Sequence, residues 1–165
     1  MIRLIERTLD TLAALAVLSL GLLIVANVLS RQLLQVGIPD VIVIVRELMV
    51  PAILFPLASA TSSRAHIAIE FIARHFPDGL NRWIAVLAAL VGLLVATVLL
   101  WAGLVELQRN WISDARYSGD FQIPRWPSRL MFVIAFAMFE VRLLQILWVD
   151  LKAAITGTPA PATLQ

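Results

Sequence analysis

Cysteine is absent from this sequence, which excludes disulfides, thiol catalysis, zinc–thiolate sites and cysteine-ligated iron–sulfur clusters. Charge is also scarce, because only 15% of the 165 residues are charged. The 13 Lys+Arg and 11 Asp+Glu leave a net charge of +2, too small and too scattered an excess to indicate nucleic-acid binding. A glycine-rich phosphate loop and a serine–histidine–aspartate set placed to meet are both missing. We therefore expect no enzyme.

Histidine is nearly absent as well. The two histidines, His66 and His75, both fall in a polar connection. A b-type haem held between membrane helices needs histidines within those helices, so this placement argues against haem. We expect neither a cofactor nor a metal site.

Apolar residues make up 61% of the chain, and the mean hydropathy is +0.90. The run from Ile84 to Val105 carries no charge, and as a helix it would be about 33 Å long, enough to cross a hydrocarbon core of about 30 Å. A helix at the surface of a soluble protein would keep a polar face, and this run has none. A buried helix of a large soluble enzyme is the alternative, and three further apolar runs in a chain of 165 residues argue against it. Trp83 and Trp101 near its ends are typical of aromatic belts at the two membrane surfaces. The run predicts a transmembrane helix in contact with membrane lipid.

Three more apolar runs predict an all-α integral membrane protein, with one four-helix domain over residues 1–155. The predicted transmembrane helices cover residues 11–34, 41–62, 82–108 and 128–149. The first run could also belong to a signal peptide, but no small-x-small cleavage site follows it. The second contains Pro51 and Pro56, which remove backbone hydrogen bonds and bend helices. Residues 156–165 lack periodicity and are predicted to be a disordered tail.

A short amphipathic helix is predicted over residues 63–76, between the second and third spans. Ile69 and Ile72 fall on one face of this helix, whereas Glu70 and Arg74 fall on the other. Such a pattern is typical of a helix that lies in the membrane interface. An ordinary polar connector is the alternative interpretation. Basic residues are nearly equal in number on the two sides of the membrane, so their bias leaves the topology open.

Several charged residues lie within or beside the predicted spans. Arg31 ends the first span and Glu47 begins the second at the same membrane face, so we predict that they interact. The adjacent Arg46 points about 100° away from Glu47, which prevents a pair between those two. Charges that simply extend to the interface are the alternative. Glu140 lies near mid-depth of the fourth span and is either an ion or proton site or a structural charge paired within the bundle.

Short motifs stand at the ends of the predicted spans. They are Asn27-x-x-x-Arg31, Arg46-Glu47-Leu48, Arg64-Ala-His66-Ile67-Ala-Ile69-Glu70, Pro77 with Arg82, and Ile123-Pro124-x-Trp126. With these motifs, and with four spans in a chain of this length, the sequence resembles the small membrane subunit, of the DctQ type, of tripartite ATP-independent periplasmic (TRAP) transporters. Two positions depart from the pattern, since the family often has an acid where Arg46 stands and an aspartate where Glu70 stands.

The resemblance implies four transmembrane helices in the bacterial inner membrane, with both termini cytoplasmic. It implies two partners, a larger TRAP permease subunit and a periplasmic substrate-binding protein. It further implies that the large subunit holds the substrate and ion sites, while the small subunit is a stationary scaffold in the ion-gradient-driven uptake of an organic acid. The motif residues are then candidates for structural or interface roles.

Residues 109–126 form the longest polar connection, in which Arg109, Arg116 and Arg125 alternate with two aspartates. If the termini are cytoplasmic, this connection faces the periplasm, and we predict that it docks the binding protein through mixed charges. The alternative is an ordinary solvated loop. A rival function also stays open: a self-sufficient homo-oligomeric transporter or channel that uses Glu140 as its coupling carboxylate.

Overall fold

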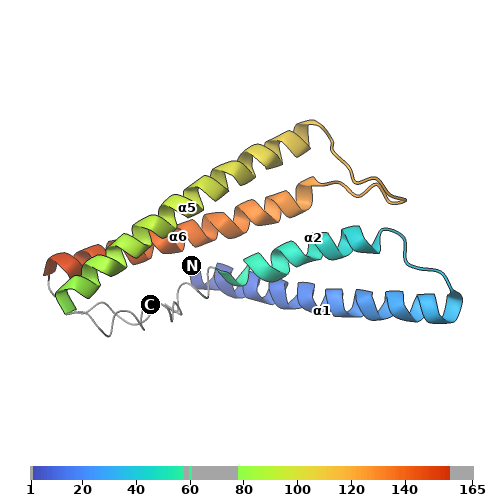
Figure 1. The fold of residues 1–165 in the computed structure, drawn as a ribbon, viewed down its shortest axis with the longest axis horizontal. Helices are drawn as coiled ribbons and strands as arrows, with labels where there is room; N and C mark the ends of the chain where they lie inside the picture. Colours follow the sequence, from blue (N-terminus) through green and yellow to red (C-terminus); the bar gives the residue numbers. More distant parts are fainter. Residues whose placement is uncertain (1, 58–59, 61–77, 157–165) are drawn as a thin grey trace. The chain divides into compact units, whose positions relative to one another are not determined.

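The computed structural model describes residues 2–57, 60 and 78–156 of the chain (Figure 1). Four helices are described, and they are α1 (Ile2–Leu34), α2 (Val41–Leu54), α5 (Asp78–Ile112) and α6 (Trp126–Thr156). In these ranges the only extended pairing is one isolated antiparallel bridge between Arg116 and Pro124. The all-helical prediction is confirmed for the described part of the chain. The amphipathic helix predicted over 63–76 lies outside it. So does the tail predicted over 156–165, except for Thr156, which is the last residue of α6.

Three of the helices are long and apolar enough to cross a membrane. These apolar stretches cover Ile5–Leu34, Arg82–Ile112 and Trp126–Thr156. Their large apolar side chains are exposed along much of their length, as Leu22 at 74% and Leu94 at 66% illustrate. A helix satisfies its own backbone hydrogen bonds and can therefore lie in lipid. Exposure of the same apolar side chains to water would cost free energy. The protein is therefore a membrane protein.

The helices extend beyond the spans predicted from hydropathy. The helix α1 begins at Ile2 instead of residue 11, and α5 continues to Ile112 instead of residue 108. Hydropathy reports where a helix enters the hydrocarbon, whereas backbone hydrogen bonding continues into the polar flank until a turn ends it. The polar connection between α5 and α6 is correspondingly short and covers residues 113–125.

The helix α2 is the shortest of the four. Its 14 residues correspond to about 21 Å, less than the thickness of a hydrocarbon core. The Phe55 N–H still bonds to the Pro51 carbonyl at 3.2 Å, and helical geometry resumes at Pro56 and Leu57. The break falls directly before Pro56, which has no N–H and whose ring crowds the preceding turn. The second predicted span is thus described only over its first part.

The chain divides into two units, which we describe separately. The first combines Met1–Pro56 with Ala102–Ala135, and the second combines Leu57–Trp101 with Phe136–Gln165. In the first unit, α1 and α2 form an antiparallel hairpin that is connected by residues 35–40 (Figure 1).

In the second unit, α5 contacts α6 through small residues. A Cβ built at Gly92 would lie 3.6 Å from the side chain of Leu143. The neighbouring Ala89 and Ala96 on α5 are buried, with 5% and 1% of their surfaces exposed. Small residues at such positions let two membrane helices approach closely.

Candidate functional site

The turn between α1 and α2 is held by two motif residues of α1. Asn27 and Arg31 are four residues apart and therefore lie on one face of the helix. The Asn27 Oδ1 accepts a hydrogen bond from the Ile38 N–H at 3.0 Å. The Arg31 guanidinium lies so close to Gly37 that a Cβ there would be 3.0 Å from the Arg31 Nε. The Asn27-x-x-x-Arg31 motif thus fixes the turn that leads into α2.

Asp40 stands at the N-cap position of α2 but does not cap it with its side chain. Its backbone is left-handed, with φ at 53°, and its side chain makes no hydrogen bond to the first turn. The Asp40 carboxylate instead accepts the Phe121 N–H at 2.7 Å. Asp tolerates left-handed geometry better than most residues, although the conformation is strained and persists only where its surroundings hold it. Asp40 therefore connects the α1–α2 turn to the α5–α6 connection.

Residues 113–125 fold back on themselves, and we call this segment the 113–125 hairpin. The Tyr117 N–H bonds to the Ile123 carbonyl at 2.9 Å, and the Arg125 N–H bonds to the Ala115 carbonyl at 3.0 Å. Near its tip, Gly119 lies against the Asp40 carboxylate, where an added Cβ would overlap the carboxylate oxygens. Only glycine fits this close approach without a shift of Asp40.

Glu47 lies at the centre of the contacts between α2 and the α5–α6 connection. Its Oε1 accepts hydrogen bonds from the Tyr117 hydroxyl and from the Ser128 hydroxyl, both at 3.0 Å. Ser128, in the first turn of α6, is 1% exposed, and Glu47 itself is half-buried. Hydrogen bonds to an ionised carboxylate are stronger than neutral ones, so Glu47 joins α2, the 113–125 hairpin and α6.

Two arginines flank the Tyr117 ring in this cluster. The guanidinium carbon of Arg125 lies 4.7 Å from the ring centroid, and that of Arg46 lies 5.6 Å from it. Both distances are within the range of cation–π attraction. We use the name Glu47 cluster for Glu47, Tyr117 and Ser128 together with Arg46, Arg125 and Arg129.

The structure does not show the interaction predicted between Arg31 and Glu47. Within the described residues they form neither a hydrogen bond nor an ion pair, because Arg31 lies against Gly37 and Glu47 contacts Tyr117 and Ser128. The sequence placed both residues at one end of the hairpin. It did not reveal the directions in which their side chains leave the two helices.

The three arginines predicted to dock a soluble partner have different environments. Arg109 is exposed near the end of α5. The Arg116 side chain is 50% exposed and pairs with Asp114 at 2.9 Å. Arg125 is half-buried and lies against Tyr117, so it is an internal contact of the Glu47 cluster. Arg109 and Arg116 alone present their charges at the surface.

The Ile-Pro-x-Trp motif closes the 113–125 hairpin and begins α6. Ile123 and Pro124 supply its returning side, as described above, and Trp126 is the first residue of α6. The ring of Trp126 meets that of Trp111 edge to face, with centroids 5.0 Å apart. The other sequence candidates, His66, Ile67 and Glu70, lie outside the described residues.

Glu140 has a polar partner on the neighbouring helix. In the second unit, the Thr97 hydroxyl lies 2.7 Å from the Glu140 Oε1 and 2.8 Å from the Leu93 carbonyl. The described residues contain no group of three or more His, Cys, Asp or Glu side chains that could hold a metal ion. The contact links one carboxylate on α6 to one hydroxyl on α5.

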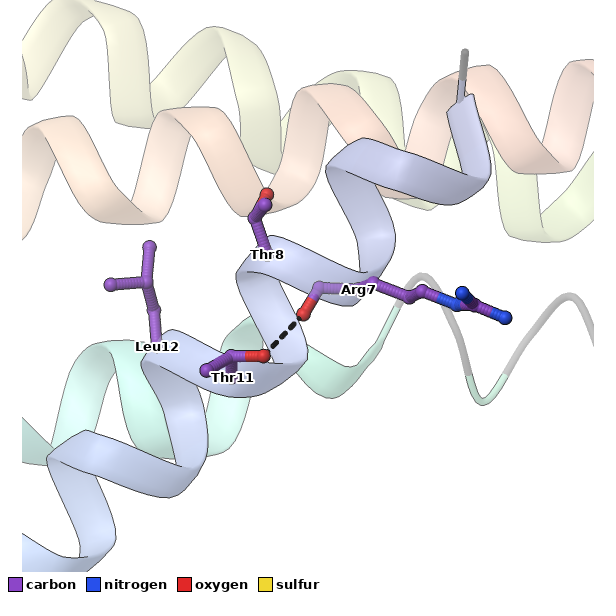
Figure 2. Close-up of a pocket in the computed structure, with 4 residues that line it drawn as sticks. All are labelled: Arg7, Thr8, Thr11 and Leu12. Carbon is purple, nitrogen blue, oxygen red and sulfur yellow. Dashed lines mark hydrogen bonds between the residues drawn. The ribbon is translucent and has the colours of Figure 1, made fainter.

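A shallow surface pocket lies along the first turns of α1 (Figure 2). Its lining consists of Arg7, Thr8, Thr11 and Leu12, all from one helix. The Thr11 hydroxyl bonds to the Arg7 carbonyl at 2.8 Å, as Figure 2 shows, so this polar group is already satisfied. Ligand sites usually combine concavity with polar groups that converge from several elements, and this pocket does not.

Sequence reasoning missed Asp40, Tyr117, Ser128, Gly119 and Thr97. Two of them carried a recognisable signal. An aspartate directly before an apolar run is a usual helix N-cap, although Asp40 serves another purpose here. Tyr117 is the only tyrosine of the chain and falls in a polar connection. No local pattern marks the other three.

Residues 20–153 match the family model described as the DctQ component of tripartite ATP-independent periplasmic transporters. This range includes the α1–α2 turn, the Glu47 cluster, the 113–125 hairpin and Glu140. A search of curated proteins gave no match.

Proposed function

Because this chain belongs to the DctQ family of TRAP transporters, we propose that it is the small permease subunit and acts as a scaffold for the large subunit. The family is a transporter component and not an enzyme family. The proposed complex takes up an organic acid, driven by an ion gradient, and receives it from a periplasmic binding protein. The family match over residues 20–153 is the observation that carries this proposal.

The distribution of polar groups supports a scaffold role. The Glu47 cluster and the α1–α2 turn join successive elements through side chains that are already engaged with one another. Along the helices, large apolar side chains are exposed and available to lipid or to another membrane subunit. A stationary scaffold needs these two properties, namely internally fixed ends and an apolar surface for partners.

We further propose four spans, with both termini on the cytoplasmic side. The hydrogen bond between Asp40 and Phe121 joins the connection before α2 to the connection after α5 within the first unit, and it supports the proposal that both connections lie on one side of the membrane. The helix α5 crosses once between these two residues. The chain returns to the same side only if residues 41–62, which include α2, cross as well. Residues 63–76 would then lie at the cytoplasmic interface.

In this topology the 113–125 hairpin faces the periplasm, and we propose that it docks the binding protein. Phe121 at its tip is 61% exposed although its backbone N–H is fixed by Asp40. Arg116 and Asp120 are exposed nearby. An exposed aromatic residue on a fixed backbone and surrounded by charges is typical of a protein contact.

The experiment is uptake into vesicles that contain this chain and the large subunit, titrated with binding protein. Phe121→Ala is expected to raise the binding-protein concentration for half-maximal uptake by about tenfold, corresponding to about 1.4 kcal/mol. Arg116→Glu should have a smaller effect that weakens with salt. Ser118→Ala, at an exposed position of the same hairpin, is the matched control.

Three results would contradict parts of this proposal. Unchanged half-maximal concentrations for both variants would assign docking to the large subunit alone. Full uptake by the large subunit without this chain would remove the scaffold role. Uptake by this chain alone, lost in Glu140→Gln, would support the rival function of a self-sufficient transporter.

A further inference from the structure

The Glu47 cluster contains more positive charge than it neutralises. Arg125 and Arg129 are half-buried, and the Nε of each is buried without a hydrogen-bond partner within the described residues. Arg129 has one long hydrogen bond, from its Nη1 to the Ser128 hydroxyl at 3.5 Å. The Glu47 Oε1 is already engaged by Tyr117 and Ser128.

Within the Glu47 cluster itself, positive charges outnumber negative charges by two. The cluster contains three arginines, of which Arg46 is exposed and the other two are half-buried. Its one carboxylate is that of Glu47. Of the carboxylates on the neighbouring segments, Asp114 pairs with the exposed Arg116, and the Glu106 Oε1 accepts a hydrogen bond from Asn110 at 2.8 Å. An excess of positive charge in a partly dry site is costly unless an anion is present, and guanidinium groups favour phosphate and carboxylate.

The position of the cluster along α6 indicates which anion is available. Arg125 directly precedes Trp126, whose ring contacts Trp111, and the apolar stretch of α6 begins at Trp126. Tryptophans at the end of an apolar helix mark the membrane–water interface. The phosphates of phospholipids lie at this depth, and the N-terminus of a helix favours anions.

We propose that Arg125 and Arg129 bind the phosphate of an anionic phospholipid at the N-terminal end of α6. The Tyr117 ring lies against one face of the Arg125 guanidinium, so Arg125 is held in position to donate hydrogen bonds. Arg129 supplies a second guanidinium within the first turn of α6. The acyl chains extend along the adjoining apolar surface of α6, where Leu130 is 38% and Ile134 is 40% exposed.

The test uses the full chain, co-purified with its membrane partner if one is required, in nanodiscs of phosphatidylcholine with or without phosphatidylglycerol. Thermal unfolding gives the stabilisation by the anionic lipid, and native mass spectrometry gives the lipid that stays bound. Phosphatidylglycerol should raise the unfolding midpoint of the unmodified protein. Arg129→Gln should lose most of that rise and bind the lipid at least tenfold more weakly.

Arg109→Gln is the matched control, because it removes one exposed arginine near the end of α5, outside the Glu47 cluster. It should keep both the stabilisation and the bound lipid. Arg125→Lys retains the charge but loses the planar donor group, so it should bind the lipid more weakly than the unmodified protein. If a variant has a lower unfolding temperature even in phosphatidylcholine alone, the test is the amount of phosphatidylglycerol that stays bound at a temperature well below the variant's unfolding midpoint.

Four outcomes would overturn the proposal. The first is an equal loss of phosphatidylglycerol binding and stabilisation in Arg129→Gln and Arg109→Gln, which would indicate only a general attraction between positive side chains and anionic lipid. The second is full stabilisation by inorganic phosphate, which would indicate a site for free anions. The third is the absence of any difference between the two lipids. The fourth is normal lipid binding by Arg129→Gln together with loss of the membrane partner, which would assign the arginine to a protein contact.

Discussion

The connections of the first unit, namely the α1–α2 turn and the 113–125 hairpin with the Glu47 cluster, are stabilised in a different way from the contact between α5 and α6 in the second unit. In the first unit, side chains join segments that are far apart in sequence, as in the hydrogen bonds Tyr117–Glu47 and Phe121–Asp40. In the second unit, α5 meets α6 through the close approach of Gly92 to Leu143 and through the hydrogen bond from Thr97 to Glu140.

This difference follows from the solvent that each region faces. The turns have backbone groups that no helix satisfies, so specific side chains must supply partners and thereby fix the connections. Inside lipid the helices satisfy their own backbone, and they associate through shape, small residues and occasional polar contacts. Loss of one polar contact should therefore cost more in the first region than in the second.

The largest effect is expected at Glu47. Glu47→Ala leaves the Tyr117 and Ser128 hydroxyls without their acceptor, at a cost of about 2–3 kcal/mol in the free energy of unfolding. Glu47→Gln keeps an acceptor and should cost clearly less. The measurement is unfolding of the purified protein in mixed detergent micelles.

Double-mutant cycles separate the observed partner of Glu47 from the predicted one. Glu47→Ala and Tyr117→Phe should couple by about 1 kcal/mol, because each removes the same hydrogen bond. Glu47→Ala and Arg31→Ala should be additive to within about 0.5 kcal/mol, because the two residues have different partners. Strong coupling of Glu47 to Arg31 would instead restore the pair predicted from the sequence.

An intermediate effect is expected where Asp40 holds the 113–125 hairpin. Asp40→Ala removes the acceptor of the Phe121 N–H and places alanine at a left-handed φ, at a cost of about 1–2 kcal/mol. Gly119→Ala should act in the same direction, because its Cβ would displace the Asp40 carboxylate. Limited proteolysis should cut the hairpin faster in both variants.

Asp40→Asn provides the control for this change. Asparagine keeps an oxygen acceptor and tolerates the left-handed backbone, so its hairpin should be cut almost as slowly as in the unmodified protein. Equal cleavage of Asp40→Ala and Asp40→Asn would mean that the Phe121 hydrogen bond does not hold the hairpin.

The same two regions also differ in how much of their structure could be predicted from the sequence. The uncharged run from Ile84 to Val105 was sufficient to predict α5, because lipid requires both the apolar composition and the helix. The ends of the helices were less predictable, since α1 also includes Arg3, Glu6 and Arg7, whose charges interrupt the apolar run.

The contacts that join the connections of the first unit were not predictable from local sequence patterns. Glu47 and Tyr117 are 70 residues apart, and Asp40 and Phe121 are 81 residues apart. No helical or strand period relates such positions. The family motifs drew attention to Asn27, Arg31, Glu47 and Trp126, but they did not reveal the partner of each residue.

The smallest effect is expected at Thr97. Thr97→Val removes the hydroxyl that contacts Glu140 while it preserves the shape of the side chain. The expected loss is about 0.6 kcal/mol, the average for polar contacts between membrane helices, because the unfolded helices in lipid also find partners. Thr97→Ser keeps the hydroxyl and is the control.

The same variant separates the two functions considered for Glu140. If Glu140 is a structural partner of Thr97, then Thr97→Val and Glu140→Gln should each reduce stability slightly and leave the uptake rate of the assembled transporter within about threefold, because a change of about 0.6 kcal/mol in an activation barrier alters a rate by no more than that. A coupling carboxylate would behave otherwise, since Glu140→Gln would abolish uptake while the protein stayed folded. Parallel measurement of unfolding and uptake on the two variants therefore determines whether the polar contact in the second unit serves packing or transport.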